Sequence, residues 1–295
     1  MGKRNRIKRF SSASDRILLG FSYTILIIFC ISIILPFWSV LMDSVSGSKL
    51  KIGIRLVPDE FSLSAYKSVL SQKSLLRNYS NTFYRVIFGT ILCVLVTYFA
   101  AYPLSKRKMP FNRLITYLVL FTMYFSGGLI PQYLLIQNLD LMDNRLVLIL
   151  PSMFNGFYIL IMRNFISEIP AELEESALID GANDYDIAFK IYMPLLFPIF
   201  ATVTMWAAVA LWNEWFTAMI YIQTPSKQVM QVILRRMLIE AQVAALYEDV
   251  NMVVEETEDA IKAVTIIITI IPIICAYPFA QKYFIKGLTS GAVKG

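Results

Sequence analysis

The sequence of 295 residues contains no histidine, only three cysteines and few charged residues. Without histidine the chain has no imidazole that could act as a general base, bind a metal ion or complete a Ser-His-Asp triad. Cys30, Cys93 and Cys275 stand singly inside apolar stretches, where thiols behave as small hydrophobic side chains. We therefore expect no disulfide framework and no catalytic, cofactor-binding or metal-binding residue in this chain.

Charged residues make up 16% of the sequence and hydrophobic residues 57%, whereas soluble domains have about 25% and 45–50%. A transmembrane helix needs about 20 apolar residues, and six stretches meet that need: 17–41, 83–104, 114–130, 146–165, 195–221 and 263–280. They are continuously apolar, whereas a barrel strand alternates at every second residue. The sequence predicts an all-α, polytopic membrane protein with about six transmembrane helices.

Most of these stretches contain a residue that interrupts a soluble helix: Pro36, Pro103, the Gly127-Gly128 pair, Pro151 and Pro272. Such interruptions are tolerated in membranes, where neighbouring helices satisfy the freed backbone groups. Residues 1–16 form a basic tail with Lys3, Arg4, Arg6, Lys8, Arg9 and Arg16. A basic tail can bind RNA, but we interpret this one as a signal that keeps the N-terminus in the cytoplasm, and expect no nucleic-acid partner. Six spans then place both termini inside.

The hydrophilic excursion at residues 167–194 predicts two short helices joined by a hinge. Pro170 suits a first helical turn, Gly181 is a natural C-terminal cap, and Asn183 is the N-cap of a second helix that stops before Pro194. Ile187 and Ile191 lie one turn apart, as do Tyr185 and Phe189. The pattern indicates a docking surface, although a hairpin that merely lies on the membrane interface would show it too.

Several motifs resemble those of known importers. The residues Glu175-Ser176-Ala177, Asp180-Gly181-Ala182, Phe189, Ile191, Pro194-Leu195 and Pro198 resemble the EAA loop of bacterial ABC importer permeases. The segment Trp212-Asn213-Glu214-Trp215 and the tail from Gln281 to Gly295 are similar to those of carbohydrate importer permeases of the MalG and LplC (YtcP-like) type. The resemblance implies a type I ABC importer (MetI-like) transmembrane fold. It divides the chain into the tail 1–16, a first helix with its outer loop at 17–77, the permease core at 78–281, and a cytoplasmic tail at 282–295.

The same resemblance implies that the EAA loop, residues 167–194, couples the permease to a separate ATPase. The coupling role would fall on Glu175, Ala177, Asp180, Gly181, Ala182, Tyr185, Phe189, Ile191 and Pro194. The implied partners are a second permease of the MalF or LplB type, two ATP-binding subunits that hold ATP and Mg, and an extracellular or periplasmic sugar-binding protein. The implied cargo is a carbohydrate, an oligosaccharide, and the implied location is the plasma membrane of a bacterium. The glycine-rich tail lacks the GxxxxGK[ST] spacing of a phosphate loop, so the chain itself binds no ATP by that device.

Residues 212–215 are candidates for the substrate path. A carboxylate at the middle of a bilayer costs roughly 2.5–3.5 kcal/mol, so Glu214 should face a wet cavity or lie near the surface. Trp212 and Trp215 could stack on sugar rings or anchor the protein at the membrane interface, and Asn213 is placed with Glu214 near the outer end of the path. The polar segment 222–259, with a helix expected around 231–246, is read either as a solvated loop or as a surface that touches an arriving binding protein.

Two other functions remain as alternatives. An ion-coupled secondary transporter of a small polar solute would show intramembrane charges and an internal repeat, and Glu214 is the one strong candidate charge. A membrane-bound enzyme would need a clustered acid, base or metal site. Neither predicts the spaced motif that follows Pro170.

Overall fold

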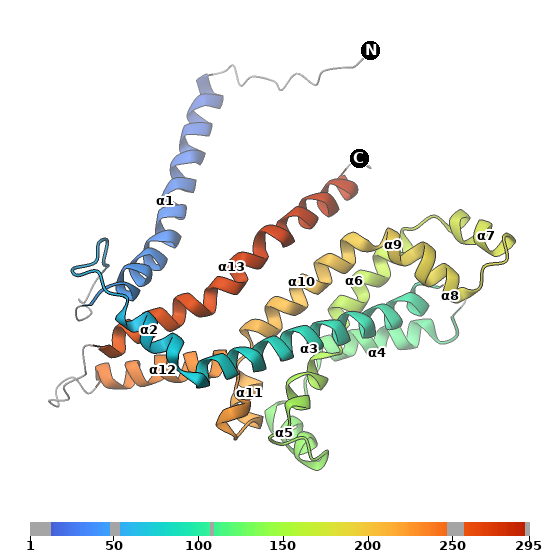
Figure 1. Cartoon of the computed structure of the whole chain (residues 1–295). Helices are drawn as coiled ribbons and strands as arrows, with labels where there is room; N and C mark the ends of the chain where they lie inside the picture. Colours follow the sequence, from blue (N-terminus) through green and yellow to red (C-terminus); the bar gives the residue numbers. More distant parts are fainter. Residues whose placement is uncertain (1–12, 48–53, 107–108, 247–256, 293–295) are drawn as a thin grey trace. The chain divides into compact units, whose positions relative to one another are not determined.

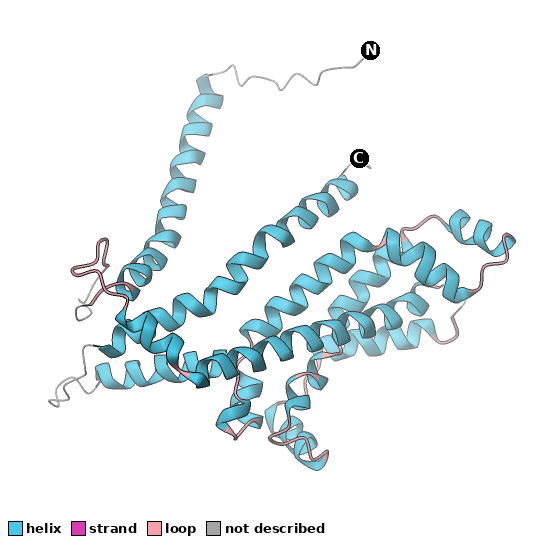
Figure 2. Ribbon diagram, viewed as in Figure 1, coloured by secondary structure: helices cyan, strands magenta, loops and turns pink. Residues whose placement is uncertain are grey.

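The computed structural model describes residues 13–47, 54–106, 109–246 and 257–292. Within these residues the chain is built of helices and loops, with one isolated antiparallel bridge between Ser46 and Phe61 (Figure 2). The predicted all-α class is confirmed. The chain divides into two compact units, Met1–Val69 with Asn251–Ile267, and Leu70–Val250 with Ile268–Gly295, and each unit is described by itself. Most of the basic tail, together with Glu255 and Glu256 of the outer segment, lies outside the described residues.

In the first unit a long apolar helix leads into a loop that is folded around one arginine. Helix α1 (Ala13–Ser44) is exposed along most of its apolar length, and a short helix α2 (Ser64–Ser71) follows the loop. Arg55 is buried and lies 3.3 Å from the carboxylate of Asp43 and 3.4 Å from that of Asp59. Its guanidinium also donates to the Ser46 hydroxyl, and its amide donates to Ser39 Oγ at 2.9 Å. The loop after α1 therefore has a polar core of its own.

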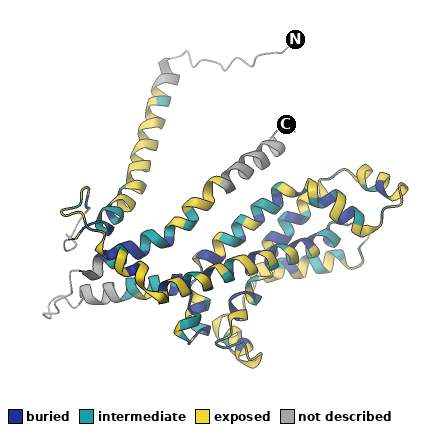
Figure 3. Cartoon of the chain, in the orientation of Figure 1, coloured by how far each residue is buried: buried dark blue, intermediate teal, exposed yellow. Residues whose placement is uncertain are grey.

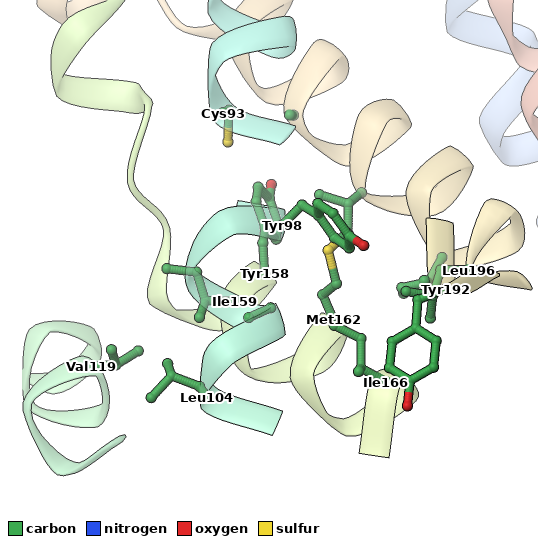
Figure 4. Close-up of a cluster of buried hydrophobic side chains, with 14 of the residues drawn as sticks. Cys93, Tyr98, Leu104, Val119, Tyr158, Ile159, Met162, Ile166, Tyr192 and Leu196 are labelled. Carbon is green, nitrogen blue, oxygen red and sulfur yellow. The ribbon is translucent and has the colours of Figure 1, made fainter. Parts of the chain in front are cut away.

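The second unit is a bundle of helices α3 (Lys73–Ser105), α4 (Asn112–Tyr124), α6 (Gly156–Ser167) and α10 (Phe197–Asn213). Helix α3 packs most extensively against α10 and α6. A Cβ atom on Gly89 of α3 would lie 2.8 Å from Leu211 Cδ1 of α10, so a larger residue there would require the Leu211 side chain to move. The core of the bundle is a cluster of buried side chains that includes Tyr98, Ile159, Met162 and Tyr192 (Figure 4).

Shorter elements complete this unit at both ends of the bundle (Figure 1). At one end lie α7 (Ala171–Ile179), α8 (Asp184–Asp186), the π-helical turn η3 (Ile187–Tyr192) and α9 (Met193–Leu195). The other elements are α5 (Leu129–Asn138), the 3-10 turns η1 (Arg145–Leu148), η2 (Leu150–Ser152) and η4 (Pro225–Lys227), and the helices α11 (Phe216–Tyr221) and α12 (Met230–Leu246). Helix α13 (Thr257–Ala292) is shared between the two units.

Three described helices are long and apolar enough to cross a membrane by themselves: residues 17–44, 73–105 and 260–278. Three further candidates are pairs of helices joined at a bend: α4 with α5 at 111°, η1–η2 with α6 at 45°, and residues 184–195 with α10 at 77°. If each bent pair is one span, the number is six, as predicted. Large apolar side chains are exposed along the outer faces of these helices (Figure 3), as expected for surfaces that meet lipid.

The structure corrects the expected course of three of the spans. The stretch 114–130 is broken before Gly128. The φ of Gly128 is 89°, a value that glycine adopts without the strain that a Cβ atom would cause. The stretch 146–165 is broken at Asn155, whose side chain accepts hydrogen bonds from the amides of Phe157 and Tyr158 and so starts a new helix. The stretch 195–221 is broken twice, at Leu196 and at Glu214, and α11 is a separate short helix.

Candidate functional site

The EAA loop projects from one end of the α3–α4–α6–α10 bundle (Figure 1). Helix α7 ends at Ile179, and Gly181, two residues later, adopts the left-handed φ of 83°. The Gly181 amide donates to Leu178 O at 3.1 Å, and the Ala182 amide donates to Ala177 O at 2.9 Å. These two bonds form a Schellman motif, the C-terminal cap that the sequence predicted. A Cβ on Gly181 would meet nothing within 4 Å, so glycine is required here for its backbone and not for space.

The second helix of the loop begins as predicted and ends later than predicted. Asn183 Oδ1 accepts a hydrogen bond from the Asp186 amide at 3.0 Å, the N-cap arrangement. The predicted stop before Pro194 is wrong, because α8, the π-helical turn and α9 follow one another directly from Asp184 to Leu195. Pro194 lies in α9, directly after the π-helical turn and one residue before this helical segment ends.

The loop side chains divide into an inner and an outer set. Ile187 and Ala177 are buried, and Ile191 and Ala182 pack against the bundle core. The outer set comprises Leu178 and Ile179, which are 53% and 86% exposed, and the motif residues Glu175, Asp180, Gly181, Tyr185 and Pro194. Phe189 lies at the boundary, where its ring stacks parallel to that of Tyr185 at 6.4 Å and meets Tyr98 edge-on at 6.1 Å.

The loop also exposes several carboxylates. Glu168, Glu172, Glu175, Asp180 and Asp184 are all exposed. Lys190 forms an ion pair with Asp186, with 2.5 Å between Nζ and Oδ1. The described outer surface of the loop therefore exposes apolar side chains, Leu178, Ile179 and Tyr185, together with several carboxylates.

A second candidate site is a cavity of about 300 Å³ between α3, α6, α10 and the turns around them. Its polar lining residues are Arg85, Gln132, Ser152, Asn155, Tyr158, Glu214 and Thr217. Arg85 is buried on α3 and forms an ion pair with the Glu214 carboxylate. Arg85 also donates from Nη1 to Glu214 O at 2.7 Å and from Nε to Leu148 O at 3.2 Å. Glu214 ends α10, and its Oε1 accepts a bond from the Thr217 amide at 2.6 Å.

Of the four predicted path residues, only Glu214 lines this cavity. Trp212 is buried, and its ring packs edge-on against Phe83 at 5.4 Å. Asn213 is exposed and donates to Val209 O at 3.0 Å. Trp215 is half-buried, with the Arg235 guanidinium 5.0 Å from its ring centroid.

Sequence reasoning missed Arg85, although a signal for it existed. Arg85 is a charged residue inside the apolar stretch 83–104, and an ionisable residue in such a stretch needs a partner or water. No group of three or more metal-ligating side chains occurs in the part of the chain that the structure describes.

Comparison with known proteins identifies the family of this chain. Residues 6–290 match the model of the family of the binding-protein-dependent transport system inner membrane component. The chain belongs to this family. It is a permease subunit of the ABC importer type, and its helical membrane fold is the one that the sequence predicted.

Three relatives show how far the likeness of this permease extends. Protein LplC of Bacillus subtilis (strain 168) is 39% identical over 240 residues, 81% of each chain. The polygalacturonan/rhamnogalacturonan transport system permease protein YtcP of the same organism is 36% identical over 286 residues, 95% of this chain and 98% of YtcP. A chain in the crystal structure of a bacterial ABC transporter involved in the import of the acidic polysaccharide alginate is 32% identical. It superimposes with a TM-score of 0.85 over 94% of this chain and 100% of that chain.

Proposed function

We propose that this permease carries carbohydrate, in the form of an oligosaccharide, as one of two transmembrane subunits of an ATP-driven, binding-protein-dependent importer. The observation that carries the proposal is the full-length match to a permease chain of an alginate importer at a TM-score of 0.85. The names of YtcP and of the melibiose/raffinose/stachyose import permease protein MelC, 27% identical over 88% of this chain, also concern sugars. The chain would be a multi-pass protein of a bacterial plasma membrane with both termini in the cytoplasm.

The EAA loop is the element that couples this permease to the ATPase. A loop that exposes apolar side chains, Leu178, Ile179 and Tyr185, together with carboxylates is suited to an apolar groove with basic residues beside it. ATP and Mg are held by the two ATP-binding subunits, and this chain supplies no catalytic group. Glu175, Asp180, Gly181 and Tyr185 form the outer face of the joint, while Ala177, Ala182 and Ile191 hold the loop on the bundle.

The substrate path runs past the polar cavity, where Glu214 offers a carboxylate to sugar hydroxyl groups. The Glu214 side chain is 31% exposed, whereas its partner Arg85 is 3% exposed, so the acceptor and not the cation faces the open space. The second permease forms the other half of the path. A sugar-binding protein delivers the cargo at the outer side, near α12.

Uptake by a strain that lacks this gene, with and without the gene restored, tests the proposal. The probes are labelled raffinose, oligogalacturonate and alginate oligosaccharides, and we expect uptake of at least one of them to require the gene. Uptake should stop when ATP is depleted by arsenate and continue when a protonophore dissipates the proton gradient. Uptake with the reverse sensitivity would favour the ion-coupled carrier, and no uptake that depends on the gene would contradict the proposal.

A further inference from the structure

A single lysine ties the C-terminal end of α3 to the EAA loop. Lys106 is the C-cap residue of α3, and its Nζ lies 2.6 Å from Glu174 Oε2 on α7. The same carboxylate oxygen accepts a hydrogen bond of 2.6 Å from the hydroxyl of Tyr192, the last residue of the π-helical turn. One carboxylate therefore holds together three segments that are far apart in the sequence.

Aromatic rings enclose the ammonium group of this joint. Lys106 Nζ lies 4.7 Å from the centroid of the Tyr102 ring and 4.6 Å from that of the Tyr192 ring. The two rings meet edge-on with their centroids 5.8 Å apart. Cation–π attraction and a charge-assisted hydrogen bond favour the same position of the ammonium group. Only about a quarter of each charged side chain is exposed, 25% for Lys106 and 26% for Glu174, so water screens the pair less than a pair on the open surface.

Two more bonds join α3 to the loop close by. The hydroxyl of Tyr98 donates to Ala188 O at 2.6 Å, and that of Tyr102 donates to Asp184 O at 3.4 Å. Tyr98 is buried in the core cluster beside Met162 (Figure 4). The C-terminal turns of α3 are thus hydrogen-bonded to α7, to α8 and to the π-helical turn.

Glu174 differs from the neighbouring carboxylates of α7 in the direction that it faces. Glu172 and Glu175, the carboxylates on either side of Glu174 in α7, are exposed, whereas Glu174 turns inward toward Lys106. The acidic residue that holds the loop on the bundle is therefore different from those that are presented to a partner.

We propose that Glu174, through Lys106, is the positioning residue that makes α3 and the EAA loop move as one body when the ATPase subunits close. The inference rests on the proposed function, because it presumes that the loop is what the ATPase moves. It adds which transmembrane helix follows the loop directly, and which two side chains make it follow. Without this pair the loop would still dock, but its displacement would reach α3 only in part.

Distance measurement in the assembled transporter tests the inference without any sugar. Nitroxide labels are placed at Leu95 on α3 and at Ser176 on α7, both exposed, in a chain whose three cysteines are replaced. Pulsed electron resonance then gives the distance distribution with and without the ATP analogue AMP-PNP. In the wild type we expect one narrow distribution that AMP-PNP leaves unchanged. In Glu174→Gln and in Lys106→Met we expect a width about twice that of the wild type, and a mean that shifts with AMP-PNP.

Two variants separate positioning from stability. Lys106→Arg keeps the positive charge, and a guanidinium is also attracted to aromatic rings, so its distribution should be closer to that of the wild type than the distribution of Lys106→Met is. Asp140→Asn removes an exposed carboxylate that lies outside the loop and should also leave the distribution unchanged. A lower thermal stability of Glu174→Gln with an unchanged distribution and an unchanged response to AMP-PNP would overturn the inference. A wild-type distance that AMP-PNP shifts as much as it does in Glu174→Gln would overturn it too.

The failure of the proposed function has a different signature. If the loop does not dock on an ATPase, the wild-type chain will not retain ATP-binding subunits during purification. If only the inference fails, the wild-type complex assembles and hydrolyses ATP while the labelled distances contradict the expectation.

Discussion

Arg85 on α3 and Glu214 at the end of α10 form an ion pair in which the cation is buried and the carboxylate faces a cavity. Removal of one member of such a pair leaves an uncompensated charge, which is more costly than removal of both. We expect Glu214→Ala to lower the stability of the detergent-solubilised protein by on the order of 2–4 kcal/mol, as thermal unfolding would show. The double variant with Arg85→Met should recover part of the loss, and Asn213→Ala, at the exposed neighbour, serves as the control. Equal losses in the single and double variants would show that the pair does not couple.

Gly181 gives a second prediction, because its φ of 83° strains any side chain that branches at Cβ. Gly181→Val should still insert, since a Cβ here meets no neighbour, but should uncouple ATP hydrolysis from uptake. Gly181→Asn is the matched variant, because asparagine tolerates the left-handed conformation better than other residues, and it should retain most of the uptake. Normal uptake by the valine variant would argue against a coupling role for this turn.

A third prediction concerns Asp143 and the dependence on pH of the stability of the turn between α5 and η1. Hydrogen bonds from Lys227, from the hydroxyl and amide of Thr224 and from the amide of Gln223 hold the pKa of Asp143 well below its usual value. A carboxyl group whose pKa is depressed in the folded state contributes stability that is complete above its unfolded pKa of about 3.9. This stability is lost as the pH falls toward the folded pKa.

Because the pKa of Asp143 is lowered by folding, acid should destabilise the folded protein. Between pH 7 and pH 5 the melting temperature should not change on account of Asp143, and below about pH 4 it should fall. Asp143→Asn should lower the melting temperature by a few degrees at pH 7 and flatten its acid dependence. Asp140→Asn, at an exposed neighbour, should do neither. An Asp143→Asn protein with the acid dependence of the wild type would contradict the assignment.

We expect the outer segment to contact an arriving binding protein and not to be needed for assembly of the transporter. The beginning of α12 is buried at Met230 and Val232, and Arg235 stacks on Trp215, so a deletion from 231 would remove part of the core. Replacing residues 237–256 by a flexible linker keeps these contacts. We expect basal ATP hydrolysis to persist and stimulation by the loaded binding protein to be lost. Stimulation to the normal extent would make the segment a passive loop.

The orientation of the chain can be read from chemical labelling in intact cells. In a background that lacks Cys30, Cys93 and Cys275, a cysteine at Ser11 should resist an impermeant maleimide, because the basic tail is expected in the cytoplasm. A cysteine at Gln223, an exposed residue of the outer segment, should react. Reaction at both positions, or at neither, would contradict six spans with both termini inside.

The sequence predicted the helical class, the Gly181 cap and the Asn183 cap, because each depends on local chemistry. Positive φ at a helix end selects glycine, and a short polar side chain selects the N-cap position, whatever surrounds them. A helix was also expected around 231–246, and α12 spans Met230–Leu246. These features need no knowledge of distant contacts.

Other features depend on contacts that the sequence cannot show. An apolar run gives the same pattern whether it is one straight helix or two helices at 111°, so the break before Gly128 could not be placed. Trp212 fits an interface anchor, a sugar platform or a core residue, and only the neighbouring rings of Tyr79 and Phe83 decide for the core. The pairing of Lys106 with Glu174 joins residues 68 positions apart.

Helix α3 carries fixed bonds near both of its ends. Toward its N-terminal half, Asn81 donates to the carbonyls of Ser226 and Gln228, and the Thr82 hydroxyl accepts from the Met230 amide. At its other end lies the joint around Lys106. The two sets are 25 residues apart, which at 1.5 Å per residue makes a rod of about 38 Å. Under the proposed function, a displacement imposed on the segment before α12 would therefore reach the EAA loop along one helix.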